Sequence, residues 1–192
     1  MFRANPERLP ENIARVEALF RQSLAHAELP PLLQHDFHTI LRVIQSLRYS
    51  GSSGQGGNYL RNYPTELGLL MESQLTKTLL TRAGRPTGSD RTPLGLKELL
   101  LQLLVRLEGV RGDATLPEGL RRTLEEVLSA AEKTAGAIET QQVVNVMLQE
   151  TGQSYLLQIP LLFPEGARLA DILIREEAQS AGGAKDRRSF CV

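Results

Sequence analysis

Three histidines are the side chains most suited to holding a metal. His35 and His38 stand three residues apart, and His26 and Glu28 come shortly before them. On a helix this spacing places both imidazoles on one surface, so a divalent metal site is conceivable there. The stretch has no thiolate and lacks the His-Glu-x-x-His spacing of metalloproteases. We therefore expect a solvated or hydrogen-bonded histidine pair, with no metal and no cofactor.

Two glycine-rich stretches raise the question of anion binding. A phosphate-binding loop needs a lysine directly after its last glycine, but no lysine lies nearer to residues 51–57 than Lys77. Residues 84–91 carry arginines and hydroxyl side chains, yet such a string between helices is typical of a loop. We expect both stretches to be connections rather than binding sites.

Nucleophilic and acid/base chemistry find no support in the sequence. The chain has no Gly-x-Ser-x-Gly motif, and its single cysteine, Cys191, stands next to the last residue with no histidine predicted beside it. The carboxylates of Glu125-Glu126 and Glu176-Glu177 point apart on a helix or a strand because they are adjacent in sequence. We therefore expect a protein that is not an enzyme.

Composition limits the other function classes. The 192 residues include 22 basic and 22 acidic side chains, so the charge balance does not favour nucleic acid or an anionic membrane as the main partner. The N-terminus lacks the apolar region of a secretory signal, and the most apolar stretch, residues 99–105, is far too short to span a membrane. We expect a soluble chain that is made in the cytoplasm.

Leucine dominates the apolar residues, with 34 leucines against nine aromatic residues. Their helical spacing predicts a mainly α fold, a leucine-rich bundle of five to six helices followed by a C-terminal β-hairpin. The apolar stripes begin at Ile13, Leu33, Leu67, Leu96, Leu120 and Ile138. Thr92-Pro93 has the form of a helix start, Thr115 to Glu118 has that of a capping box, and Gly136 is expected to divide the last two helical segments.

Five regions follow from these patterns. We expect an N-terminal helical pair in residues 1–49, a flexible Gly/Ser linker in 50–63 and a helical region in 64–152. Residues 153–177 are predicted to form the hairpin, because odd positions of 155–163 are uniformly apolar and 164–167 have turn composition. Residues 178–192 are expected to be a flexible tail that ends in the first residues of another strand. Pro160 predicts that the first strand lies at an edge of the sheet or contains a bulge.

The hairpin and the helix before it also carry a family resemblance. The segments are Ile138-Glu139-Thr140-Gln141-Gln142-Val143-Val144-Asn145, Gln153-Ser154-Tyr155-Leu156-Leu157-Gln158-Ile159-Pro160-Leu161, and Leu169-Ala170-Asp171-Ile172-Leu173-Ile174. Together they resemble the region just before the C-terminal domain of flagellar hook-length control proteins, and the resemblance covers residues 95–177.

This resemblance implies a non-enzymatic protein that passes through the flagellar type III export apparatus without a cleaved signal. Such a protein reports hook length and switches the apparatus from hook to filament substrates by contacting an export-gate membrane protein. The implied partners are export-gate and hook components. The resemblance implies no nucleic acid and no small-molecule substrate, and contact with a membrane only through a partner protein. The family's switching domain follows the matching region, so no switch residue is assigned here.

The predicted interaction surfaces are the strand at 155–163, as a strand-pairing edge, and the helix at 138–148 beside it. The candidate interaction residues are Tyr155, Leu157, Ile159, Leu161, Phe163, Gln141, Gln142 and Asn145. Both surfaces also fit ordinary packing. A second hypothesis is a free-standing helical adaptor or homo-oligomerisation module unrelated to flagella, with the leucine stripes burying a subunit interface. A third, an enzyme built on His35, Asp36 and His38, would need a bound metal.

Overall fold

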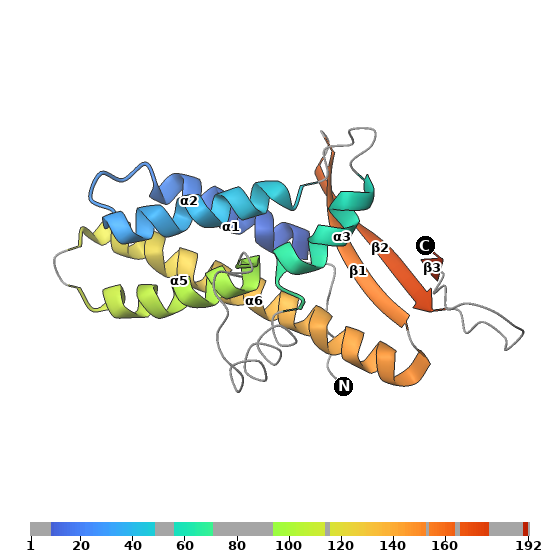
Figure 1. The fold of residues 1–192 in the computed structure, drawn as a ribbon. Coiled ribbons are helices and arrows are strands. Elements are labelled where there is room, and N and C mark those ends of the chain that lie inside the picture. Colours follow the sequence, from blue (N-terminus) through green and yellow to red (C-terminus); the bar gives the residue numbers. More distant parts are fainter. Residues whose placement is uncertain are drawn as a thin grey trace, which may run out of the picture.

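The computed structural model describes residues 9–48, 56–70, 94–113, 116–152, 154–163, 166–176 and 190–191. Its elements are α1 (Leu9–Ser23), α2 (Pro31–Ser46), α3 (Gly56–Leu67), α5 (Leu96–Arg111), α6 (Glu118–Gly152), β1 (Ser154–Phe163), β2 (Gly166–Glu176) and β3 (Phe190–Cys191). The helices form a bundle with the hairpin at one end (Figure 1). The predicted fold, mainly helical with a C-terminal hairpin, is confirmed.

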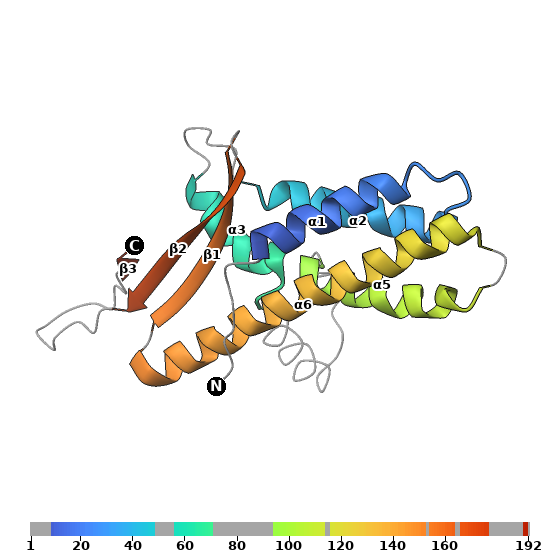
Figure 2. The same ribbon diagram turned by 180° about the vertical axis from the view of Figure 1, so that it is seen from behind.

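The first two helices form the expected N-terminal pair. Pro31 begins α2, where its missing N–H costs no hydrogen bond because the first turn leaves its donors unpaired. Both helices bury the faces that the leucine pattern predicted, including Val16 and Phe20 of α1 and Ile40 and Ile44 of α2. The pair lies against α5 and α6, as Figure 2 shows from behind.

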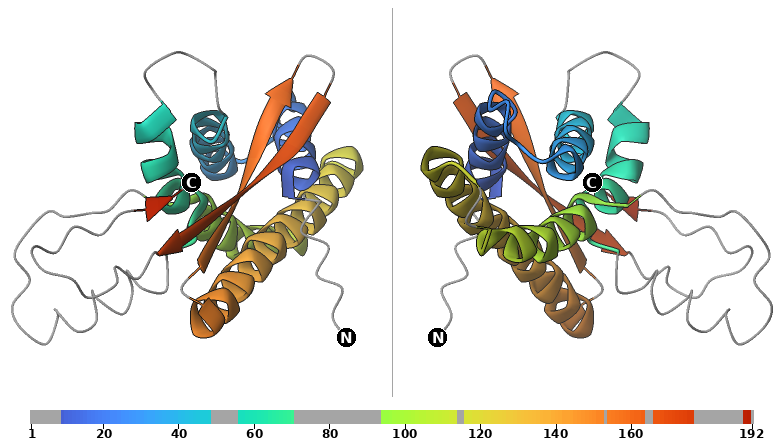
Figure 3. Two further views of the ribbon diagram at one scale, coloured as in Figure 1. Left: turned by 90° about the vertical axis from the view of Figure 1, so that its right-hand side faces the viewer. Right: turned by 90° about the vertical axis from the view of Figure 1, so that its left-hand side faces the viewer.

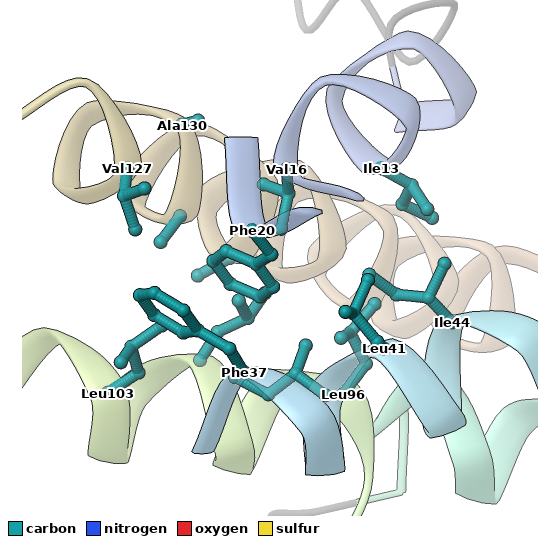
Figure 4. Close-up of a cluster of buried hydrophobic side chains, with 14 of the residues drawn as sticks. Ile13, Val16, Phe20, Phe37, Leu41, Ile44, Leu96, Leu103, Val127 and Ala130 are labelled. Atoms are coloured by element: carbon teal, nitrogen blue, oxygen red, sulfur yellow. The ribbon is translucent and has the colours of Figure 1, made fainter. Parts of the chain in front are cut away.

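An aromatic pair occupies the centre of this bundle. The rings of Phe20 and Phe37 stack with centroids 4.5 Å apart and planes 9° apart, and both side chains are fully buried. Figure 4 shows them between Leu103 of α5 and Val127 of α6. Four helices therefore meet at one aromatic contact, and each supplies side chains to a single core.

The linker predicted over residues 50–63 is wrong in its second half. Helix α3 begins at Gly56, so residues 56–63 are helical, while residues 50–55 lie outside the described residues. Tyr63 and Leu67 are fully buried, and the core packing of this face outweighs the glycines and the internal Pro64. The many glycines of this stretch favour a linker, so the sequence does not predict the short apolar stripe of Tyr63 and Leu67.

The end of α3 touches the start of α5 at two glycines. Gly68 has a φ of +89°, and a Cβ there would lie 2.8 Å from the Cβ of Lys97. A Cβ on Gly95 would lie 2.6 Å from the carbonyl oxygen of Thr65. Gly95 is the residue before the first turn of α5, so the helix starts later than Thr92-Pro93, which lie outside the described residues.

Residues 118–152 form one helix rather than the two expected around Gly136. A glycine inside a helix costs about 1 kcal/mol relative to alanine, but its neighbours Ala135 and Ile138 are buried in the core. Packing on both sides of Gly136 therefore keeps the helix continuous at this residue. Thr115 of the predicted capping box lies outside the described residues.

Three strands make an antiparallel sheet in the order β1-β2-β3. The register of the hairpin runs from Ser154 opposite Arg175 to Phe163 opposite Gly166. On the other side of β2, Phe190 and Cys191 pair with Glu176 and Arg175. The predicted return strand is confirmed. At the end of the predicted tail Phe190 and Cys191 form a short strand, while residues 177–189 lie outside the described part of the chain.

Candidate protein-interaction surface

The histidine cluster does not form a site in the structure. His35 and His38 are exposed on α2, and Asp36 between them forms an ion pair with Arg106 of α5. In the part of the chain that the structure describes, no group of three or more His, Cys, Asp or Glu side chains is arranged to hold a metal ion. None of the described helices combines the length and apolar character needed to cross a bilayer.

One face of the hairpin packs on the helices as the alternation predicted. Leu157 and Ile159 are each 2% exposed, and Tyr155 is half-buried on the same face. Their cross-strand partners on β2 are Ile172, Ala170 and Ile174. The backbone of Leu161 and Phe163 continues β1, but their side chains lie outside the described part of the structure.

Gln158 faces away from this apolar surface and is nevertheless buried, with 3% exposure. Its side-chain Nε2 donates a hydrogen bond of 3.2 Å to Oδ1 of Asp171 on β2. Its carbonyl oxygen accepts a 2.7 Å hydrogen bond from the hydroxyl of Tyr63, which lies 95 residues earlier in the chain. Alternation alone predicts an exposed Gln158, and nothing local in the sequence points to Tyr63 as its partner.

On the edge of β1 that faces away from β2, polar side chains from two helices hydrogen-bond the strand backbone. Asn145 of α6 accepts a 2.7 Å hydrogen bond from the N–H of Leu156 through Oδ1, and Gln141 donates to the carbonyl of Leu156 at 3.5 Å. Tyr63 of α3 binds the next outward carbonyl, that of Gln158. Pro160 has no N–H to offer. A partner strand could pair here only by displacing these side chains, so the geometry does not favour the predicted strand-pairing role of β1.

The third amide of the predicted site, Gln142, joins α6 to the end of α3. Its Nε2 donates to the carbonyl oxygens of Gly68 at 3.0 Å and Leu69 at 3.1 Å. The ammonium group of Lys97 donates to Gln142 Oε1. Gln141, Gln142 and Asn145 thus each bind the backbone of a neighbouring segment.

An exposed apolar stripe lies on α6 beside these amides. Val143, Val146 and Met147 are 49%, 55% and 60% exposed, and their spacing places them on one helix face. They border a groove of about 580 Å³. Its lining residues are Leu69, Leu70, Glu139, Gln142, Val143, Asn145, Val146, Met147, Glu150 and Tyr155. The helix at 138–148 is a predicted interaction surface, but Val143, Val146 and Met147 are not among the predicted residues, because helical spacing alone does not separate an exposed apolar stripe from a buried one.

The groove is lined by apolar side chains together with two glutamates of α6. Glu139 and Glu150 are the only charged residues among those that line it, and both are carboxylates. Glu150 follows Glu139 by eleven positions, so the two residues lie about 16 Å apart along the helix axis. The surface therefore suits an apolar segment that carries basic residues toward its ends.

The fold places this protein among mainly helical bundles that carry a C-terminal β-hairpin. Compared with family models, with curated proteins and with solved structures, the chain matches none.

Three tyrosines with raised pKa values predict a loss of stability at alkaline pH. Burial raises the pKa of Tyr63 well above its usual value, and burial followed by the Glu66 carboxylate raises that of Tyr59. Burial also raises the pKa of Tyr155, against the opposing hydrogen bond from Asn145. A raised folded-state pKa contributes stability that is complete below the unfolded value of about 10 and is lost as the pH rises through the folded value.

The free energy of unfolding should therefore fall as the pH rises above about 10. Urea denaturation at a series of pH values, with tyrosinate absorbance recorded on the native protein, measures this loss. Tyr63→Phe should make the decline shallower. A free energy of unfolding that stays constant through the pH range in which free tyrosine ionises would contradict the burial of these hydroxyls.

Proposed function

We propose that the protein is a non-enzymatic interaction protein that binds another protein through the groove beside α6. The observation that carries this proposal is the exposed stripe of Val143, Val146 and Met147, which borders the groove. Contiguous exposed apolar side chains on a folded surface are costly unless a partner covers them. Helix α6 holds the stripe in place because Gln141 and Asn145, on a neighbouring face of the same turns, bind the backbone of β1.

The partner that fits is an amphipathic segment with apolar anchors and flanking lysine or arginine residues. An apolar helix face can bury against the valines and methionine, as helix-in-groove complexes do. The carboxylates of Glu139 and Glu150 would attract its basic ends and fix its orientation. Because these contacts lie near the surface, binding should weaken as the salt concentration rises.

The resemblance to hook-length control proteins supplies the biological setting of this proposal. It covers residues 95–177, which contain α5, α6 and the hairpin, and therefore include the stripe. We propose that the protein enters the flagellar type III export apparatus and contacts the cytoplasmic part of an export-gate membrane protein through the groove. Loss of that contact would leave the apparatus on hook substrates.

A cell experiment tests this function with a matched pair of variants. Val146→Asp places a charge in the apolar stripe, whereas Val105→Asp places the same charge on α5, where Val105 is 74% exposed. In a flagellated bacterium that carries the gene, Val146→Asp should give overlong hooks and few filaments, while Val105→Asp should leave hook lengths unchanged. Normal hooks with Val146→Asp, at wild-type protein levels, would contradict the proposal.

The second hypothesis, a homo-oligomerisation module unrelated to flagella, needs a different surface from the one first expected. The α5 leucines that could have formed a subunit interface, among them Leu100 and Leu103, are buried within the chain itself, at 0% and 1% exposure. These leucines are therefore not available for a subunit interface.

A further inference from the structure

One wall of the groove beside α6 comes from the end of α3. This α3 wall consists of Leu69 and Leu70, and Leu70 is 37% exposed. The chain reaches the wall through Gly68, whose φ is +89°. The N–H of Gly68 donates to the carbonyl oxygen of Thr65 at 3.1 Å, and that of Leu69 donates to Pro64 at 2.8 Å. These two bonds and the positive φ form a Schellman motif, which fixes the direction in which the wall leaves α3.

Gln142 joins this wall to the helix that carries the apolar stripe. Its side-chain Nε2 donates to the carbonyl oxygens of Gly68 at 3.0 Å and Leu69 at 3.1 Å. The N–H groups of the same two residues are already bonded to α3, so their carbonyls are the groups left to bind α6. Gln142 also lines the groove. The spacing between α6 and the α3 wall therefore depends on the amide of this one side chain.

Lys97, in the first turn of α5, orients that amide. Its ammonium group donates to Oε1 of Gln142, so the Nε2 hydrogens are left for the carbonyls of Gly68 and Leu69. Lys97 is only 6% exposed, and a buried charge is costly unless polar groups bind it. A Cβ on Gly68 would lie 2.8 Å from the Cβ of Lys97, so the glycine allows α5 to approach this closely. Figure 3 shows the junction from both ends of the bundle, with the end of α3 beside the start of α5.

We infer that Lys97 and Gln142 are positioning residues of the groove, which hold the α3 wall at the spacing that the partner requires. The inference rests on the proposed function and names the residues that shape its site. Lys97 is absent from the groove lining and acts through Gln142. A groove with walls from separate elements binds more tightly when those walls are already ordered, because the cost of ordering them is not paid on binding.

Hydrogen exchange on the free protein tests this clamp without any partner. Gln142→Met keeps the length of the side chain and removes its hydrogen bonds to Lys97, Gly68 and Leu69. Amides in peptides that cover residues 67–70 should exchange at least about fivefold faster, as expected for the loss of one net hydrogen bond. Gln102→Met makes the same change at an exposed position of α5 and should leave that exchange at the wild-type rate.

Lys97→Met separates positioning of the wall from stability of the fold. Methionine keeps an apolar stem in the buried site, and such a replacement of a buried charge is often neutral or stabilising. The urea midpoint should therefore not fall below that of the wild type. The Kd for the purified cytoplasmic domain of an export-gate membrane protein should nevertheless rise at least about fivefold in Lys97→Met and in Gln142→Met. Gln102→Met should keep the wild-type Kd.

Three results would overturn the inference. One is wild-type exchange of residues 67–70 in Gln142→Met, and another is a wild-type Kd in both clamp variants. The third is a Lys97→Met protein that loses stability and affinity together, which would make the lysine a structural residue only. A wild-type protein that does not bind the export-gate domain contradicts the proposed function instead. The exchange measurement needs no partner, so the clamp and the proposed function can fail separately.

Discussion

Replacing Phe37 with alanine is expected to lower the free energy of unfolding by about 3–5 kcal/mol. Phe37 is fully buried and stacks on Phe20 at the point where four helices meet. Removing its ring loses the transfer energy of the side chain and leaves a cavity that the surrounding helices fill only in part. Because single domains are stable by only about 5–15 kcal/mol, this change takes a large share of the total.

Leu32→Ala is the control for that variant, since Leu32 lies on the same helix and is 58% exposed. Its effect should stay within about 0.5 kcal/mol. Urea denaturation followed by circular dichroism measures both variants against the wild type. Equal losses for Phe37→Ala and Leu32→Ala would contradict the placement of Phe37 at the centre of the bundle.

Replacing Ile159 with aspartate is the second large change, with an expected loss of about 4 kcal/mol or more. Ile159 is 2% exposed on the face of β1 that packs on the helices. A carboxylate there would lose its hydration, and the apolar neighbours Leu157 and Ala170 offer it no partner. The hairpin would have to leave the bundle or the whole domain would unfold.

Leu173→Asp provides the matched comparison on the neighbouring strand, because Leu173 is 39% exposed and faces the other side of the sheet. Its effect should be less than half that of Ile159→Asp. Hydrogen exchange measured by mass spectrometry locates the damage, since loss of docking would remove protection from residues 154–176 first. A wild-type exchange pattern in Ile159→Asp would refute the packing of this face.

The helices that periodicity predicted are those whose leucine stripes are long and regular. Residues 9–23, 31–46 and 96–111 repeat apolar side chains over four turns, so the pattern outweighs any local irregularity. Helix α3 is short, begins at Gly56 and contains Pro64, and its burial comes from tertiary contacts that no local pattern contains. The same argument explains why Gly136 did not divide α6.

The candidate surface was predicted only in part. Gln141 and Asn145 are four residues apart and share the helix face that meets β1, whereas Gln142 is directed toward the end of α3. Their roles as clamps on Leu156, Gly68 and Leu69 depend on which backbone segments pack beside the helix. Exposure of Val146 depends on the same packing, so sequence periodicity could not separate it from the core.

The most direct test of the account is the binding of a purified cytoplasmic domain of a flagellar export-gate membrane protein. Titration calorimetry should give saturable binding to the wild type and a Kd at least about tenfold higher for Val146→Asp, a change of 1.4 kcal/mol. Val105→Asp should leave the Kd unchanged, since it lies on α5 away from the groove. Equal affinity for the two variants, or no binding by the wild type, would contradict the claim that α6 and its groove form the interaction surface.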